Sequence, residues 1–182
     1  TRDPTIPELD FASGRKAVLA DTVGFISQLP TELIEAFKST LEEVVHADVM
    51  LHVHDASSPQ VTEEAADVIS VIGDLGMDVE TQAARVVHVL NKADLLEADD
   101  EQVASLQNMF PSGVFVSATT GDGVDDLMAY LDRHLGKLAI LVTVDVSPID
   151  GAARAWLHQN AMVKSSHFDE RGHEQILVSI SP

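Results

Sequence analysis

The chain has 182 residues, 45% hydrophobic and 23% charged, a composition that favours a folded core and argues against global disorder. Its formal net charge of −19 argues against binding to free DNA, because a field of that sign repels phosphates. No cysteine is present and no apolar run reaches the roughly 20 residues of a membrane span, which argues against disulfides and a spanning helix and fits a cytoplasmic protein.

Strand and helix patterns alternate over the first three quarters of the sequence. Residues 15–21 predict a strand, residues 31–46 a helix, and residues 48–57 a strand with Val49, Leu51 and Val53 on one face. The later elements predicted are a helix at 62–75, a strand at 86–91, a helix at 101–109, a strand at 113–118 and a helix at 122–136, with Gly76 and Gly136 ending their helices. This alternation predicts a doubly wound α/β domain with helices on both faces of a mostly parallel sheet.

The last quarter has a different pattern. A strand at 138–146, a helix at 148–159 and a hairpin of strands at 161–168 and 174–181 predict a small α+β unit of β-α-β-β order. We therefore expect one domain at 1–137 and a second at 138–182. Trp156 is expected in the core of the second domain.

The tetrapeptide "NKAD", Asn91 to Asp94, follows a predicted strand. The Asp94 carboxylate can accept two parallel hydrogen bonds from the ring N–H and the exocyclic amine of guanine, whereas adenine presents an acceptor at the ring position. Lys92 can lay its stem along the base, and Asn91 can join neighbouring loops. The alternative is an ordinary polar turn after a strand.

Two further motifs follow predicted strands. The backbone N–H groups of "SAT", Ser117 to Thr119, can reach the guanine carbonyl oxygen. In "DTVG", Asp21 to Gly24, the aspartate suits Mg²⁺ through a water and Gly24 allows close approach of a γ-phosphate. Each alone is equally an ordinary turn, but the three motifs in this order favour a guanine-nucleotide site.

Longer stretches carry a more specific resemblance: "LADTVGFISQLPTELIEAFKSTLEE", "ADVMLHVHDAS", "LNKADLL" and "VSATTGDGVDDL". Together with "TRDPT" at the start, they resemble the HflX GTPases, in the Obg-HflX branch of translation-factor GTPases. The resemblance implies an incomplete Ras-like P-loop GTPase domain and the small C-terminal domain of that family. It also implies a cytoplasmic, GTP-hydrolysing factor that acts on the large ribosomal subunit and can split stalled ribosomes. We expect it to be a monomer.

The resemblance also assigns site residues. Thr1 falls on the switch threonine that ligates Mg²⁺ and senses the γ-phosphate, and Asp21 and Gly24 fall on the second switch. The residues that would contact GTP or GDP and Mg²⁺ are Thr1, Arg2, Asp3, Asp21, Thr22, Val23, Gly24, Asn91, Lys92, Asp94, Ser117, Ala118 and Thr119. Thr1, Asp21 and Gly24 would take part in hydrolysis.

The sequence departs from the GTPase pattern in two places. It has no Gly-x-x-x-x-Gly-Lys-Ser/Thr phosphate loop, because its one Gly-Lys pair, Gly136-Lys137, is followed by Leu138. Phe25 occupies the position where many GTPases have a water-orienting glutamine, so slow intrinsic hydrolysis is expected. Since the chain also begins at Thr1, we expect a piece of a longer GTPase that binds nucleotide weakly alone. Two alternatives remain, a nucleotide-free acidic interaction module and a receiver-like phosphoacceptor domain.

Histidines suggest two possible metal sites. His52, His54 and Asp55 form one candidate, because the two histidines share one face of a predicted strand. His167 and His173 flank the predicted hairpin turn and form the other. The alternative for both groups, ordinary strand residues with a capping aspartate, is the one we favour from the sequence.

Overall fold

A computed structural model describes residues 7–21, 44–97 and 101–180 of the chain. It divides into two compact units, one of residues 20–128 and one that joins residues 1–19 to residues 129–182. The expected division at residues 137 and 138 stays a prediction. No helix in the described ranges is both long and apolar enough to cross a membrane.

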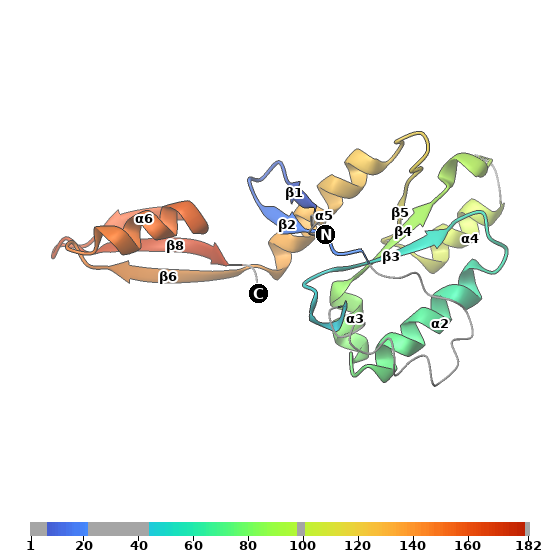
Figure 1. Cartoon of the computed structure of the whole chain (residues 1–182), viewed down its shortest axis with the longest axis horizontal. Coiled ribbons are helices and arrows are strands. Elements are labelled where there is room, and N and C mark those ends of the chain that lie inside the picture. Colours follow the sequence, from blue (N-terminus) through green and yellow to red (C-terminus); the bar gives the residue numbers. More distant parts are fainter. Residues whose placement is uncertain (1–6, 22–43, 98–100, 181–182) are drawn as a thin grey trace, which may run out of the picture. The chain divides into compact units, whose positions relative to one another are not determined.

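The unit of residues 20–128 is built on a parallel sheet (Figure 1). Strands β3 (Met50–Asp55), β4 (Val86–Asn91) and β5 (Val114–Phe115) lie in the order β3-β4-β5. In the β3–β4 register, His52 lies opposite His88 and Asp55 lies opposite Asn91. The carboxyl ends of both strands therefore meet at one edge of the sheet, where ligands bind in open α/β sheets.

Helices α2 (Val61–Asp74) and α4 (Glu101–Met109) pack on this sheet through a compact apolar core. The unit also contains α3 (Val79–Arg85), the short 3-10 helix η1 (Ala93–Leu95) and the start of α5 (Val124–Leu138). One core cluster consists of Ala56, Val61, Ala65, Leu90, Leu106 and Phe110. Val87 and Val89 are buried on the opposite face of β4, so this strand is covered on both sides. This agrees with the apolar sequence of residues 86–91.

One predicted strand lies elsewhere. Residues 15–21 were expected to form a strand of the parallel sheet, but β2 covers only Lys16–Val18 and pairs antiparallel with β1 (Glu8–Asp10) in a separate two-stranded sheet. Asp132 of α5 holds the turn between them, because it accepts hydrogen bonds from Ser13 and Arg15. Asp21 therefore follows a hairpin strand and not a strand of the parallel sheet.

Several boundaries also differ from expectation. The strand expected at 113–118 is only two residues long, because the backbone of Ser117 turns into a loop and donates to Asp122. Gly136 lies inside α5, which ends at Leu138, because its backbone keeps a helical φ. Helix α3 was not predicted; Asp78 caps it by accepting a hydrogen bond from Thr81 N at 2.7 Å. Only Val44–His46 of the helix expected at 31–46 are described, and they are helical.

The two faces of β3 differ in burial. Val53 is 58% exposed, whereas His54 is buried. The ring of Phe110 lies 4.7 Å from the ring of His54, so the histidine face and not the valine face packs against the core.

The C-terminal part has the predicted β-α-β-β order. Strands β6 (Ile140–Val146), β8 (Glu174–Ile180) and β7 (Met162–Phe168) form an antiparallel sheet, and α6 (Gly151–Asn160) lies along it (Figure 1). Leu157 of α6 packs with Val146, Ile176 and Val178 in its core. Trp156 is 61% exposed, so its expected place in this core is wrong: the neighbouring Leu157 provides the buried position.

Candidate functional site

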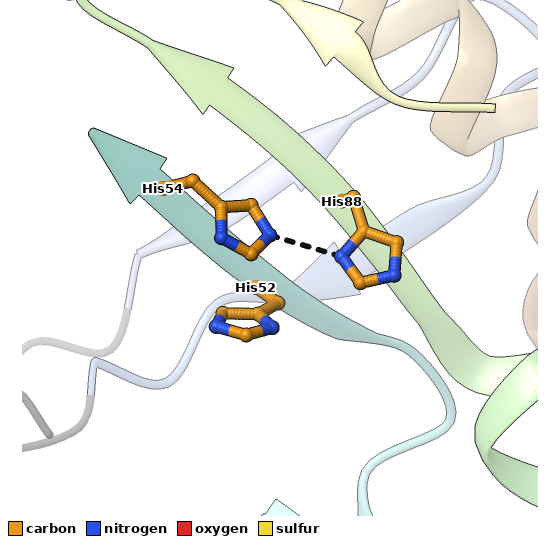
Figure 2. Close-up of side chains that lie close together, drawn as sticks. All are labelled: His52, His54 and His88. Carbon is orange, nitrogen blue, oxygen red and sulfur yellow. Dashed lines mark hydrogen bonds between the residues drawn. The ribbon is translucent and has the colours of Figure 1, made fainter. Parts of the chain in front are cut away.

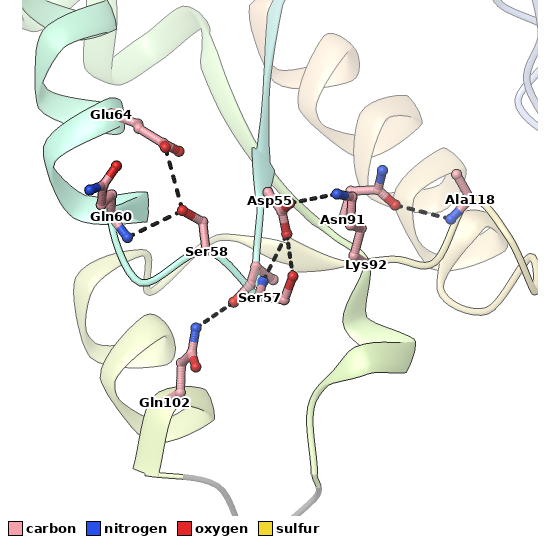
Figure 3. Close-up of polar contacts among 10 residues, drawn as sticks. Asp55, Ser57, Ser58, Gln60, Glu64, Asn91, Lys92, Gln102 and Ala118 are labelled. Carbon is pink, nitrogen blue, oxygen red and sulfur yellow. Dashed lines mark hydrogen bonds and ion pairs between the residues drawn. The ribbon is translucent and has the colours of Figure 1, made fainter. Parts of the chain in front are cut away.

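Two loops meet at the carboxyl edge of the parallel sheet, one after β4 and one after β5. Backbone hydrogen bonds join them: Val116 N donates to Leu90 O at 2.9 Å, and Ala93 N donates to Val116 O at 3.0 Å. The side chain of Asn91 adds a third link, because its Oδ1 accepts a hydrogen bond from Ala118 N at 3.0 Å (Figure 3). The "NKAD" and "SAT" loops are thus held as one polar surface.

Lys92 is fixed in its loop by an acid from the neighbouring strand. Its Nζ lies 2.6 Å from Asp55 Oδ2 (Figure 3). The hydrogen bond with Lys92 lowers the pKa of Asp55, and the same contact raises the pKa of Lys92. Both groups are therefore charged at neutral pH. Lys92 is also the one described residue other than glycine with a positive φ, 63°, a left-handed backbone conformation.

The "SAT" loop is shaped by its serine. Ser117 is fully buried, and its Oγ accepts a hydrogen bond from Thr120 N at 3.1 Å. Its own N–H donates to Asp122 O at 2.8 Å. Because Ser117 is turned inward, Ala118 and Thr119 are left exposed beside the "NKAD" loop.

The predicted base-reading residues thus lie on one edge. Asn91 and Ala118 are in direct contact, and Asp94 is exposed in η1 next to them in the chain. The predicted phosphate-side residues Thr1, Arg2, Asp3, Thr22, Val23 and Gly24 lie outside the described residues, as does Phe25. Asp21 is described and exposed. The residues predicted to contact the base are therefore the part of the predicted site that the described ranges bring together.

Sequence reasoning missed two supporting residues. Asp55 was considered as a metal ligand, but it is the partner of Lys92 and also accepts hydrogen bonds from Ser57. Gln102 of α4 donates from Nε2 to the carbonyl oxygen of Ala56 at 2.7 Å, next to Asp55. The sequence signal available for Asp55 was an aspartate near the end of a predicted strand, as for Asp21.

We expect Asn91→Ala to uncouple the two loops, because Ala118 N then loses its acceptor. The free energy of unfolding should fall by about 1 kcal/mol, the net value of one such hydrogen bond. Amide hydrogen exchange at Ala118 should become faster. Asn91→Asp keeps an acceptor oxygen and should leave Ala118 protected; equal exchange in both variants would contradict this role.

Comparison with known proteins decides the family. Residues 1–92 match the family described as "50S ribosome-binding GTPase", which is half of the chain. The chain belongs to this family. Among its relatives, GTPase HflX of Caldanaerobacter subterraneus subsp. tengcongensis is 39% identical over 176 residues, covering 94% of the chain and 38% of the relative. GTPase HflX of Escherichia coli K12 is 33% identical over 178 residues, covering 98% of the chain and 41% of the relative.

These matches confirm the resemblance to the HflX GTPases that the sequence motifs indicated. The fold agrees as well: the crystal structure of the SsGBP variant G235S aligns with a TM-score of 0.59 and 20% identity over 71% of the chain and 46% of that structure. The incomplete Ras-like α/β fold of this HflX-type chain is thereby supported. The chain spans about two fifths of the length of these HflX relatives.

Proposed function

We propose that the protein to which this chain belongs binds GTP and hydrolyses it, and that it acts in the cytoplasm on the large ribosomal subunit as HflX-type GTPases are expected to. The observation that carries the proposal is the joined pair of loops at the sheet edge, with Asp94 and the Ala118 amide exposed beside the Asn91 link. The family membership supports the same nucleotide.

The base would be recognised by complementary donors and acceptors. The Asp94 carboxylate accepts from the ring N–H and the amine of guanine, and the amides of the "SAT" loop donate to its carbonyl oxygen. The stem of Lys92, held at its Nζ by Asp55, provides a flat surface beside the base. Adenine would leave Asp94 without its hydrogen bonds, and a site of this kind rejects the wrong base by roughly 10⁴-fold.

Apart from Asp21, the phosphate side rests on residues outside the described ranges. By family resemblance, Thr1 and Asp21 would hold Mg²⁺, which supplies charge stabilisation to phosphoryl transfer. Gly24 would donate its amide to the γ-phosphate, and Phe25 leaves the attacking water without a side-chain partner. Slow hydrolysis is therefore proposed, with GTP and GDP as the ligands.

A nucleoside titration tests the base site separately from the phosphates. With ¹⁵N-labelled chain, guanosine should shift the amide signals of Asn91, Asp94 and Ala118 with a Kd in the millimolar range, about 10-fold or more tighter than adenosine. Asp94→Asn should abolish this preference, and Asp74→Asn, an exposed aspartate at the end of α2, should not. Equal shifts with adenosine would refute a guanine site.

The phosphates and the partner need their own measurements. A fluorescent GTP analogue should bind the 182-residue chain weakly or not at all, since its sequence holds no phosphate loop. Micromolar or tighter binding would contradict that expectation. The proposed ribosome association would be refuted if the GTP-bound protein failed to cosediment with large ribosomal subunits.

A further inference from the structure

Three histidines gather on one face of the β3–β4 pair. His52 and His54 project from the same side of β3, and the register places His88 of β4 directly opposite His52. Each imidazole offers one nitrogen, and these three nitrogen atoms all lie within 4.8 Å of one another. Figure 2 shows the three rings on the same side of the two strands. In the part of the chain that the structure describes, no other such group of three ligands is present.

The ring nitrogens of this cluster are only partly satisfied by hydrogen bonds. His54 Nε2 and His88 Nδ1 lie 2.9 Å apart and share one proton when both rings are neutral (Figure 2). The Nδ1 of His52 is buried and has no hydrogen-bond partner. An unpaired buried nitrogen costs free energy that a bound cation would recover. Burial also lowers the pKa of all three rings, so at neutral pH they are in the unprotonated form that coordinates metals.

We propose that His52, His54 and His88 form a binding site for a divalent transition-metal ion, with Zn²⁺ as the ion it fits best. Three imidazole ligands without a carboxylate or thiolate suit Zn²⁺ and the neighbouring divalent ions of the first transition series. They do not suit Mg²⁺ or Ca²⁺, which prefer oxygen ligands. Three histidines leave a fourth tetrahedral position for water. His52 and His88 are only partly buried, so solvent can reach the cluster.

The spacing of the three nitrogen atoms is close to that of a metal site. Nitrogen ligands about 2.1 Å from a tetrahedral ion lie about 3.4 Å from each other. The distance from His54 Nε2 to His88 Nδ1, 2.9 Å, is shorter than this value, so these two rings would have to move apart, and the upper bound of 4.8 Å for the whole cluster is longer than it. Phe110 lies against both His54 and His88, with ring centroids 4.7 and 4.8 Å away, and forms an apolar wall behind them.

An ion held here would join β3 to β4. Those strands run directly into Asp55 and Lys92, so the ion would fix the two strands whose ends carry the ion pair of the candidate base site. The site is distinct from any Mg²⁺ bound with nucleotide, because its ligands lie in the middle of the strands and are nitrogen atoms.

Calorimetric titration of the tag-free 182-residue chain with ZnCl₂ tests the proposal. One equivalent of Zn²⁺ should bind with a Kd in the micromolar range or tighter and should raise the Tm, since ligands of the native state stabilise it. His88→Gln should weaken binding at least about 10-fold. The matched control is the double variant His167→Gln/His173→Gln, which removes two histidines of the hairpin and should bind zinc as the unchanged chain does.

Spectroscopy on the unchanged chain tests metal binding without any variant, so its outcome does not depend on whether a variant folds. One equivalent of Co²⁺ should give the visible absorption of a tetrahedral nitrogen-ligated ion, and Zn²⁺ should shift the imidazole NMR signals of His52, His54 and His88 before those of other histidines. Absence of stoichiometric binding would overturn the proposal. So would binding that the His167→Gln/His173→Gln variant loses and His88→Gln retains.

Discussion

Gly123→Ala is expected to lower the free energy of unfolding by more than about 3 kcal/mol. Gly123 has a φ of 74°, which an L-residue adopts only at a cost of about 1 to 2 kcal/mol. A β-carbon there would also lie inside contact distance of the Phe115 carbonyl oxygen and 3.2 Å from Val116 Cα. These are backbone atoms of β5 and the segment after it, so no side-chain rotation relieves the overlap.

Thermal and urea unfolding measure this effect, and the chain provides a matched control. Gly121 lies two residues earlier with a φ of 86°, but a β-carbon there meets nothing within 4 Å. Gly121→Ala should therefore cost only about 1 to 2 kcal/mol, the backbone part alone. If the two variants were equally stable, that result would contradict the close packing of Gly123 against the backbone of Phe115 and Val116. The amide signals of Ala118 and Thr119 should also move more in Gly123→Ala.

Acidification from about pH 7 to about pH 5 is expected to remove on the order of 3 kcal/mol of stability through the histidine cluster. Burial first, and then the charges of the other two rings, lowers the pKa of His52 from 6.5 to about 3. Burial and the charge of His88 lower the pKa of His54 to about 4. Below pH 6.5 the unfolded chain takes up protons that the native cluster does not, so stability is highest above 6.5 and falls as the pH decreases.

Urea unfolding at several pH values, in the presence of a chelator, measures this dependence. His54→Leu removes the buried imidazole of the cluster and should make the loss clearly smaller. His46→Gln, which removes an exposed histidine of the same unit, is the matched control variant. A profile that His54→Leu does not flatten would show that His54 is protonated in the native state or has the same pKa when unfolded.

The spacing of polar and apolar residues correctly predicted those helices and strands whose formation is determined by their own segment of sequence. Helix α4 has the bounds expected from its polar and apolar spacing, and β4 has those expected from its continuous apolar sequence. Helix α3 was missed because it has only seven residues, too few for a periodic pattern, and depends on the Asp78 cap. The sequence pattern of β2 indicates an extended backbone, but it contains no information on the partner strand, which is β1.

Contacts between distant segments were harder to predict. The "NKAD" and "SAT" motifs were found because each is continuous in sequence, whereas the Lys92–Asp55 pair joins the loop after β4 to the end of β3. His88 was not associated with His52 and His54, because only the strand register brings it opposite His52. Nothing in the sequence near His88 specifies that register; it follows from the parallel pairing of β3 with β4.

The left-handed backbone of Lys92 places stability and chemistry in conflict at one position. Glycine adopts a φ of 63° without strain, so Lys92→Gly would relax the loop by about 1 kcal/mol. The same change would remove the ammonium group that Asp55 holds and the stem proposed to lie beside the base. The strain of the backbone and the ion pair with Asp55 therefore act in opposite directions on stability at this position. In the proposed base site, the lysine would lay its stem beside the base while its backbone stays strained.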